Sequence, residues 1–378
     1  MIKWIVKYGV VIVLLNTILL AIPSTRSLGN LIFLSLMIAY SILIIVNPKH
    51  LKEVIFHKAF FFFLILNVLN ILYFTLFHSF DDITAIQYLL ARGVQFSIIS
   101  FAIIYNYNYF KKDFLIHVSY VIIGVVILGL IIDPFIFSGR YRGIIWNPNM
   151  FSSFTSMAFA VLFLREGKRS RLMLFLLFLL FIVSLASGSR DVLVSFLLLF
   201  LFKYGFSRRN FLYALLGLGI YFLTTNFQLD TSINRFASQE LFNDRLLQYR
   251  YAYETILQKP FIGFGLDKYA YINSDVIPEY FRGRVISAHN GYLAILTQYG
   301  LIFGLLIICI ILYKVLSLFF QVDKKDVELL SYLYIACYVP IAALYETFLT
   351  GINEFHTILF WFSLAFLSFS AFKHKHES

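Results

Sequence analysis

Charged residues are scarce in this chain, and cysteine and proline are rare. Only 13% of its 378 residues are charged, whereas 60% are apolar, and the mean hydropathy is +0.82. A soluble globular protein of this size carries about 25% charged residues, so the composition excludes that class and indicates a helical membrane protein with several spans. The two cysteines, Cys309 and Cys337, lie inside apolar runs, which argues against a disulfide framework.

Several catalytic motifs are also missing. No G-x-x-x-x-G-K, H-E-x-x-H or G-x-S-x-G occurs, so nothing indicates ATP use, a zinc protease or a serine hydrolase. No Cys/His spacing typical of a metal site occurs either, and we predict no metal and no cofactor. The first apolar run lacks an A-x-A-like cleavage site, which favours a first transmembrane helix over a removed signal peptide.

The net charge of +11 would fit a nucleic-acid partner, but the basic residues form short clusters between apolar runs. Membrane orientation and lipid headgroups explain such clusters, so we predict membrane lipids and no nucleic acid as partners.

The chain is predicted to be one all-α integral membrane domain over residues 1–378, with about twelve transmembrane helices. The apolar spans are expected at residues 4–22, 29–47, 58–77, 85–106, 114–133, 149–164, 172–186, 191–204, 210–226, 287–317, 329–345 and 356–372. Lysine and arginine gather in alternate connections, which predicts that both termini are cytoplasmic. The long polar loop 227–286, between spans nine and ten, is then extracytoplasmic, together with the connections near 134–148, 187–190 and 346–355.

Spans seven and eight are short for a membrane crossing. Ser187-Gly188-Ser189-Arg190-Asp191 joins Leu172–Ala186 to Val192–Phe202, and this tight link is expected to lie below the outer membrane surface. Arg190 would then point into a protein cavity, where an ionisable group is a candidate for function. Alternatively, Arg190 pairs with the neighbouring Asp191 or extends to the interface.

A surface helix is predicted from Asn243 to Lys259, with Asn243 or Asp244 capping its start and Pro260 ending it. One face is expected to carry Leu246, Tyr249, Tyr253, Ile256 and Leu257. Arg245 and Tyr249 are i,i+4 neighbours, and Arg250 lies on a different side. Arg245 could hold phosphate oxygens, to which its planar guanidinium donates two hydrogen bonds. Alternatively, the arginines contact lipid headgroups.

His289 directly precedes an apolar helix expected over Tyr292–Val315. The positive end of a helix dipole disfavours imidazolium, so the histidine should stay neutral, as a general base requires. The same N-terminus favours a bound anion. In the alternative interpretation, His289 caps its helix or bonds a carbonyl.

Further candidates for substrate binding surround these residues. Arg140, Arg142 and Asn149 belong to the loop before span six, Asn290 follows His289, and Arg92 lies about two turns inside span four. The arginines could instead contact lipid phosphate nonspecifically. Candidates for orienting a sugar hydroxyl or a histidine are the expected outer carboxylates Asp81, Asp82, Glu346 and Glu354.

Four motifs occur in an order and on a predicted side that resemble the O-antigen ligase and Wzy-type polymerase superfamily of bacterial envelope glycosyltransferases. They are G-I-I-W-N-P-N-M at 143–150, S-G-S-R-D at 187–191, D-R-L-L-Q-Y-R-Y-A-Y-E-T-I-L-Q-K-P-F-I-G-F-G-L at 244–266, and A-H-N-G-Y-L at 288–293. The resemblance covers most of the chain from about 140 to 315.

The resemblance implies a metal-independent, inverting transfer from an undecaprenyl-pyrophosphate-linked glycan donor, in the bacterial cytoplasmic membrane. Arg190 and Arg245 match the arginines that hold the pyrophosphate, and His289 matches the histidine that activates the acceptor hydroxyl. Tyr249 stands where many relatives have tryptophan, a departure expected to alter packing more than chemistry.

The function predicted is polymerisation of surface polysaccharide repeat units, in which one lipid-linked repeat or chain is joined to another and the acceptor is a glycan. The alternative is a ligase that passes the finished chain to lipid A core or to protein. A flippase and a chain-length regulator are candidate partners. A more remote alternative is a flippase, but the candidate residues gather toward one side of the membrane, which favours chemistry at that surface.

Overall fold

A computed structural model describes residues 2–46, 48–137, 139–165, 170–189, 191–224, 240–267 and 288–377, and these residues form helices and connections without a strand. The α-helices are α1 (Ile2–Ala21), α2 (Arg26–Val46), α3 (Pro48–Ile55), α4 (Phe61–Phe77), α5 (Ile83–Lys112), α6 (Phe114–Ile132), α7 (Pro148–Leu164), α8 (Arg171–Ala186), α9 (Asp191–Tyr204), α10 (Arg208–Thr224), α12 (Glu240–Gln258), α13 (Gly291–Gln321), α14 (Val327–Ala342) and α15 (Phe355–Glu377). Two short 3-10 helices, Pro23–Thr25 and Lys58–Phe60, precede α2 and α4.

Each of the predicted apolar spans falls on one of these helices. By length and composition, seven of the described helical segments can cross a membrane: Trp4–Ala21, Pro23–Val46, Lys58–Phe77, Ile83–Lys112, Phe114–Ile132, Gly291–Gln321 and Phe355–His376. Helices α7, α8 and α14 are apolar but shorter. The all-helical membrane architecture is therefore confirmed, and the total of twelve crossings stays a prediction.

Helices α14 and α15 form the centre of the bundle. Of the apolar window in α15, 83% is buried within the protein, and α14 buries residues on all sides, including Tyr332, Tyr334 and Tyr338. A helix that is apolar all round and surrounded by other helices is expected to be a core element. This central pair fixes the position of the connection between its members, residues 343–354.

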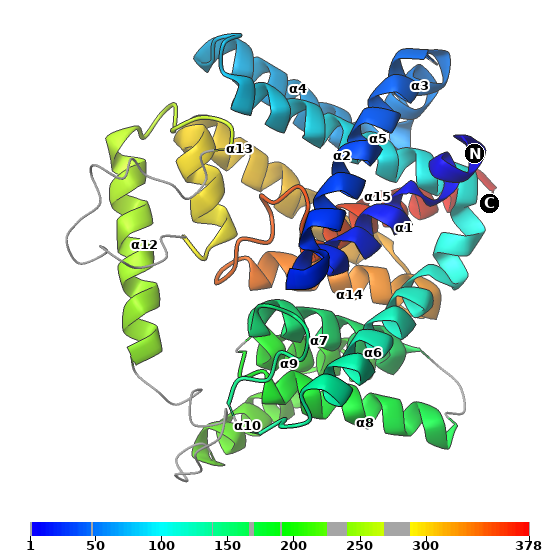
Figure 1. The fold of residues 1–378 in the computed structure, drawn as a ribbon, viewed down its shortest axis with the longest axis vertical. Coiled ribbons are helices and arrows are strands. Elements are labelled where there is room, and N and C mark those ends of the chain that lie inside the picture. Colours follow the sequence, from blue (N-terminus) through cyan, green and yellow to red (C-terminus); the bar gives the residue numbers. More distant parts are fainter. Residues whose placement is uncertain are drawn as a thin grey trace.

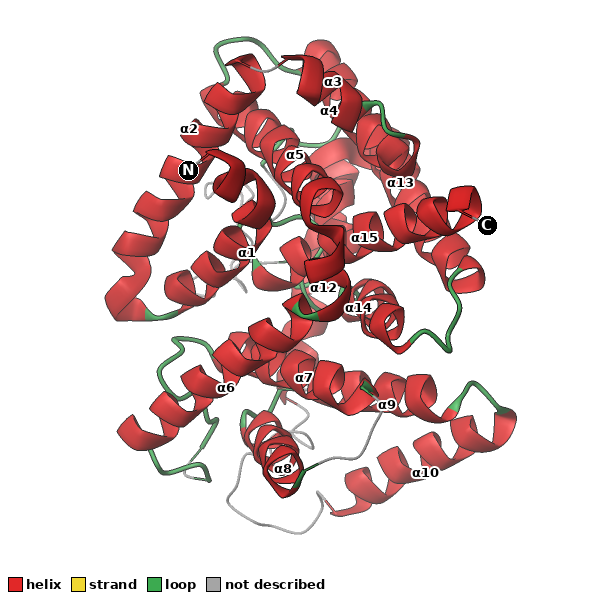
Figure 2. Cartoon of the chain, turned by 90° about the vertical axis from the view of Figure 1, so that its right-hand side faces the viewer, coloured by secondary structure: helices red, strands yellow, loops and turns green. Residues whose placement is uncertain are grey.

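Helix α12 runs across the bundle and not along it (Figure 1). The two chain termini lie at the opposite side of the protein (Figure 1), and Figure 2, which views that side, places both of them toward the reader. We call these two sides the α12 face and the terminal face. A helix that crosses the ends of the others is the expected arrangement for an amphipathic helix at a membrane surface.

Hydrogen bonds join the connections of the α12 face to one another. The Trp146 amide donates to the Ala21 carbonyl at 3.0 Å, and the Tyr141 amide donates to the Ala186 carbonyl at 2.9 Å. The Leu266 amide donates to Nε2 of His78 at 3.0 Å. These contacts bring together the connections that the charge pattern assigns to one side of the membrane.

The connections of the terminal face are joined in the same way. Lys111, at the end of α5, forms ion pairs with Asp326 at 3.3 Å and Glu328 at 3.4 Å. Lys203 of α9 donates to the Leu164 carbonyl of α7 at 3.4 Å. These contacts join connections that the charge pattern assigns to the other side of the membrane, and the placement of the loops relative to the membrane stays a prediction.

Helix α12 differs from its prediction in two details. It begins at Glu240, so Asn243 and Asp244 lie inside the first turns and are not the cap. Its packed face consists of Tyr251, Ala252, Thr255 and Ile256, whereas Leu246, Tyr253 and Leu257 are more than half exposed. The apolar periodicity identified the helix but not the side that meets the protein, because a helix on a membrane surface is apolar toward lipid as well.

The turn after α12 inserts into a break in α13. Gly300 has φ 68° and ψ −177°, so the helical hydrogen bonding of α13 is interrupted there. The Phe264 and Gly265 amides donate to the Thr297 and Gln298 carbonyls at 2.9 and 3.0 Å. The Leu301 amide donates in return to the Pro260 carbonyl at 2.7 Å. The G-F-G sequence after Pro260 is thus the anchor that holds α12 to the bundle.

Candidate functional site

His289 directly precedes the N-cap of α13, as the sequence predicts. Asn290 is the N-cap: its Oδ1 accepts from the Tyr292 and Leu293 amides at 2.9 and 3.0 Å. The Gly291 amide donates to the Ala343 carbonyl at 2.7 Å. The first three amides of α13 are therefore already bonded, so this N-terminus can offer an anion its dipole but none of these N–H groups.

The backbone of His289 adopts a left-handed conformation, with φ 40°. Such a conformation costs a non-glycine residue free energy and persists only where the surroundings fix it, which occurs often at functional sites. The imidazole is partly exposed, at 27%, and its Nδ1 lies 3.4 Å from Oε2 of Glu346. When Nδ1 carries the ring proton toward this carboxylate, Nε2 remains as the basic nitrogen.

Glu346 belongs to the 343–354 connection and was one of four carboxylates considered from the sequence. Its side chain is 15% exposed, and its second oxygen, Oε1, accepts from the Asn149 amide group at 3.3 Å. Oδ1 of Asn149 in turn accepts from the Arg140 guanidinium and from the Ser189 hydroxyl. A polar chain thus runs from His289 through Glu346 and Asn149 to Arg140. It joins segments that are far apart in the sequence.

The link between α8 and α9 forms the floor of this cluster. Ser187 and Ser189 are 0% and 5% exposed, so both serines are buried within the protein, and the depth of the link in the membrane stays a prediction. Nε of Arg140 donates to the Ser187 carbonyl at 3.0 Å. Arg190, the predicted functional residue of this link, lies outside the residues that the structure describes.

The carboxylate of Asp191 anchors the link between α8 and α9 to α7. It is 3% exposed, and its carboxylate accepts hydrogen bonds from the hydroxyls of Ser189, Ser152 and Ser153. A buried carboxylate is tolerated when several donors surround it. Sequence analysis did not select these serines. The signals that could have identified them are the adjacent S-G-S-R-D motif and the pair Ser152-Ser153, two and three residues beyond Met150.

Helix α12 reaches the site through Tyr249. The hydroxyl of Tyr249 donates to the Leu344 carbonyl at 2.8 Å, and Nδ2 of Asn290 donates to the same carbonyl at 2.9 Å. Both candidates therefore position the 343–354 connection beside His289. The backbone of Arg245 lies one turn earlier in α12, while its side chain is outside the described part of the structure.

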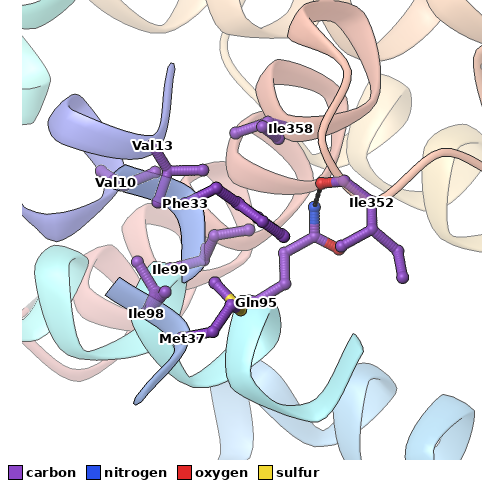
Figure 3. A pocket seen from close by; sticks show the side chains of 9 residues that line it. All are labelled: Val10, Val13, Phe33, Met37, Gln95, Ile98, Ile99, Ile352 and Ile358. Atoms are coloured by element: carbon purple, nitrogen blue, oxygen red, sulfur yellow. Dashed lines mark hydrogen bonds between the residues drawn. The ribbon is translucent and has the colours of Figure 1, made fainter. Parts of the chain in front are cut away.

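Arg92 contacts the far end of the same connection. It is 4% exposed, and its guanidinium donates to the Thr350 and Gly351 carbonyls at 2.6 and 3.3 Å. Gln95, one turn further along α5, donates to the Ile352 carbonyl at 2.9 Å (Figure 3). Figure 3 shows this contact among apolar side chains of α1, α2, α5 and α15. These two residues thereby order the segment that carries Glu346.

The side chains of Arg142 and Arg250 contact residues of their own segments. Arg142 is exposed and donates to the Trp146 carbonyl within its own loop at 2.9 Å. Arg250 is exposed on α12 and forms an ion pair with Glu254 at 2.9 Å. Both therefore lie at the surface, where an arginine readily meets lipid or substrate phosphate. Among the described residues, no three His, Cys, Asp or Glu side chains form a group that could hold a metal ion.

The site also contains an acidic group with a shifted pKa. Burial raises the pKa of Glu354 from its ordinary value to about 7, and the charge of Glu346 adds to the shift, while a hydrogen bond from Thr357 and the charge of Arg92 oppose it. Two carboxyl groups within electrostatic reach of each other resist simultaneous ionisation. Glu354 is therefore expected to be partly protonated near neutral pH.

The raised pKa of Glu354 predicts how the stability of the protein depends on pH. Between pH 4.5 and 7 the unfolded chain releases this proton while the folded protein keeps it, so the free energy of unfolding should fall as pH rises through this window, by at most about 3 kcal/mol. Glu354→Gln should remove this part of the slope. Thermal unfolding at pH 5 and pH 8 measures it, with Asp81→Asn, an exposed carboxylate of another connection, as the control. If Glu354→Gln keeps the pH dependence of the wild-type free energy of unfolding, the raised pKa does not belong to Glu354.

The arrangement combines the parts that an acyl- or glycosyl-type transfer needs. A partly exposed histidine is oriented by the Glu346 carboxylate, which accepts a hydrogen bond from the Asn149 amide group, and the amide oxygen of Asn149 accepts in turn from Arg140. Such a chain can take a proton from a hydroxyl at Nε2 and place positive charge near a leaving anion.

Fold and site together define an integral membrane protein with a polar cluster at one face of a helical bundle. Residues 175–309 match the family model described as O-antigen ligase (Wzy_C). This match supports the O-antigen ligase and Wzy superfamily that the motifs indicate, and the matched segment runs from α8 into α13. No curated protein matches the chain.

Proposed function

We propose that the protein transfers a glycan from undecaprenyl pyrophosphate to an acceptor hydroxyl and so joins repeat units of a surface polysaccharide. The observation that carries the proposal is the polar chain from His289 through Glu346 and Asn149 to Arg140 at the start of α13. The match of residues 175–309 to the O-antigen ligase family supports the same class of reaction.

In the proposed reaction, the acceptor oxygen attacks the anomeric carbon of the donor sugar as the bond to the pyrophosphate oxygen breaks. Nε2 of His289 takes the acceptor proton, and Glu346 stabilises the imidazolium that forms. Undecaprenyl pyrophosphate leaves with the bonding electron pair. The attack from the opposite face inverts the anomeric centre, and the step as proposed requires no metal.

Cationic side chains stabilise the charge that develops on the leaving group. We assign this role to Arg190 and Arg245, following the motifs that carry them, with Arg140 closing the other side of the site. Fixed guanidinium groups in a site of low dielectric constant stabilise a developing anion more strongly than water does. Arg142 and Arg250 are proposed to meet phosphate or sugar at the rim.

The charge pattern supports a cytoplasmic-membrane protein whose α12 face is extracytoplasmic and whose termini are cytoplasmic. In this orientation the donor lipid keeps its polyprenyl chain in the outer leaflet while its pyrophosphate reaches the cluster. A flippase that delivers the donor and a chain-length regulator are the proposed protein partners.

A ligase is the second candidate, and the description of the matching family favours it. In that reaction the same site would pass a finished chain to a hydroxyl of lipid A core or of a protein. The two functions differ in the acceptor and not in the chemistry proposed for His289.

The test is a glycan assay in cells that lack the native protein and express the wild type or Arg245→Ala, with Arg209→Ala on the terminal face as the charge-matched control. Accumulation of single lipid-linked repeats with loss of the polymer ladder would support the polymerase. Long lipid-linked chains without transfer to a core or protein would support the ligase. Unchanged glycans in a well-expressed Arg245→Ala variant would contradict the proposal and favour transport.

A further inference from the structure

A polar cavity opens on the terminal face, away from the candidate site. Its volume is about 230 Å³. Four helix ends meet there: the end of α5, the start of α6, the end of α7 and the start of α14. The lining combines the cations Lys111, Lys112 and Arg165 with Glu328 and with an apolar wall that includes Leu115. Nothing in the chemistry proposed above uses this cavity.

The charges in this cavity are only partly compensated. Lys111 forms ion pairs with both Asp326 and Glu328, at 3.3 and 3.4 Å, so these two acids already have a cationic partner. Asp326 is also the N-cap of α14, because its Oδ1 accepts from the Glu328 amide at 3.0 Å. Lys112 and Arg165 form no hydrogen bond or ion pair with another residue that the structure describes. The cavity and its rim therefore carry a net positive charge of one, counting these five residues.

Lys112 and Arg165 come from two different helices, and this arrangement indicates that the cavity binds a ligand. The dipole of α5 is sufficient by itself to explain a lysine at position 112, because the C-terminal end of a helix favours a cation. Arg165 is the C-cap of α7, and the dipole of that helix favours a cation there in the same way, but neither dipole accounts for the two cations lining one cavity from different helices. Two cations from different helices, converging on one cavity and without an acidic partner among the residues that the structure describes, are suited to an anion.

The apolar wall restricts the kind of anion. Leu115 and Val161 are 7% and 5% exposed, and Ile116 is half-buried beside them. A small hydrated ion gains nothing from such a wall, whereas a phospholipid places methylene groups directly beside its phosphate. Burial of each methylene contributes about 0.8 kcal/mol. In the topology predicted from the charges, the ends of these helices lie at the level of the lipid headgroups.

We propose that this cavity binds the phosphodiester headgroup of an anionic phospholipid from the leaflet opposite the candidate site. Lys112 and Arg165 contact the phosphate oxygens, and Leu115, Ile116 and Val161 contact the adjoining glycerol and first methylenes. The cavity lies between α5, α6, α7 and α14. Its lipid therefore connects α5, which carries Arg92, to α7, which carries Asn149.

The test uses the purified full chain in a neutral detergent and measures its thermal midpoint while phosphatidylglycerol, phosphatidylcholine or inorganic phosphate is added. Phosphatidylglycerol should raise the midpoint, and phosphatidylcholine should not. The double variant Lys112→Ser/Arg165→Ser should need at least about ten times more phosphatidylglycerol for the same shift, which corresponds to about 1.4 kcal/mol.

Arg208→Ser/Arg209→Ser is the matched control, because it removes two exposed charges from the same face outside the cavity. It should respond to phosphatidylglycerol like the wild type. Equal weakening in both double variants would overturn the proposal in favour of nonspecific attraction to the face. An equal shift of the wild type by inorganic phosphate would overturn it in favour of a site for a free anion.

Discussion

Replacement of His289 by alanine is expected to slow glycan transfer by about 10²- to 10⁴-fold while the helical bundle stays folded. The imidazole is the basic group of the polar cluster, and its Nδ1 lies 3.4 Å from Oε2 of Glu346. The side chain is partly exposed and its loss leaves no large buried cavity, so the effect on stability should be small. Purified protein in vesicles, supplied with the lipid-linked donor and an acceptor, gives the rate.

Glu346→Gln separates the role of the carboxylate from that of the histidine. It removes the charge that orients Nδ1 and stabilises imidazolium but keeps a similar shape, so a smaller loss of rate is expected. Because the two residues act as a unit, the double variant should be no slower than His289→Ala alone. If the loss of rate in the double variant equals the product of the two single losses, His289 and Glu346 act independently.

His117→Ala is the matched control for the histidine variant. His117 is exposed near the start of α6, on the terminal face, and its Nδ1 lies 3.5 Å from the Tyr109 hydroxyl. Its replacement should leave the rate unchanged. Full activity of His289→Ala, with the protein present in the membrane at the level of the wild type, would exclude His289 as the base.

Gly263→Ala is expected to destabilise the protein by about 3 kcal/mol or more and to release α12 from the bundle. Gly263 has φ 70°, and a Cβ atom there would lie 2.4 Å from the Gly300 nitrogen and 2.5 Å from the Gln298 oxygen. Both contacts are to backbone, which cannot move aside without breaking the hydrogen bonds between this turn and α13. Backbone conformation and space both exclude a side chain at this position.

The consequence should extend from stability to activity, because the turn anchors the helix that carries Arg245 and Tyr249. Thermal unfolding and protease cleavage between α12 and α13 measure the release. Gly124→Ala in α6 is the matched control: its Cβ would meet nothing within 4 Å, so a glycine-to-alanine change in a helix should be neutral or slightly stabilising. Wild-type stability and protease resistance in Gly263→Ala would contradict the anchoring role.

Local sequence patterns were sufficient for much of the fold. Apolar runs of about membrane length identified the helices, and the alternation of basic clusters predicted which connections share a face. The position of His289 immediately before α13 also followed from its neighbours in the chain. These features depend on residues within one or two turns of each other, so periodicity and composition report them directly.

The sequence by itself therefore determined that this protein is an all-helical membrane protein with motifs that resemble those of the O-antigen ligase and Wzy superfamily, whereas the partners within the site were decided by tertiary structure. Four carboxylates were equally acceptable from the sequence, and packing of α13 against the 343–354 connection selected Glu346. Arg92 was expected to bind substrate, yet its guanidinium donates to carbonyls about 258 residues away. No local pattern records such contacts, because they depend on which helices pack side by side and at what depth.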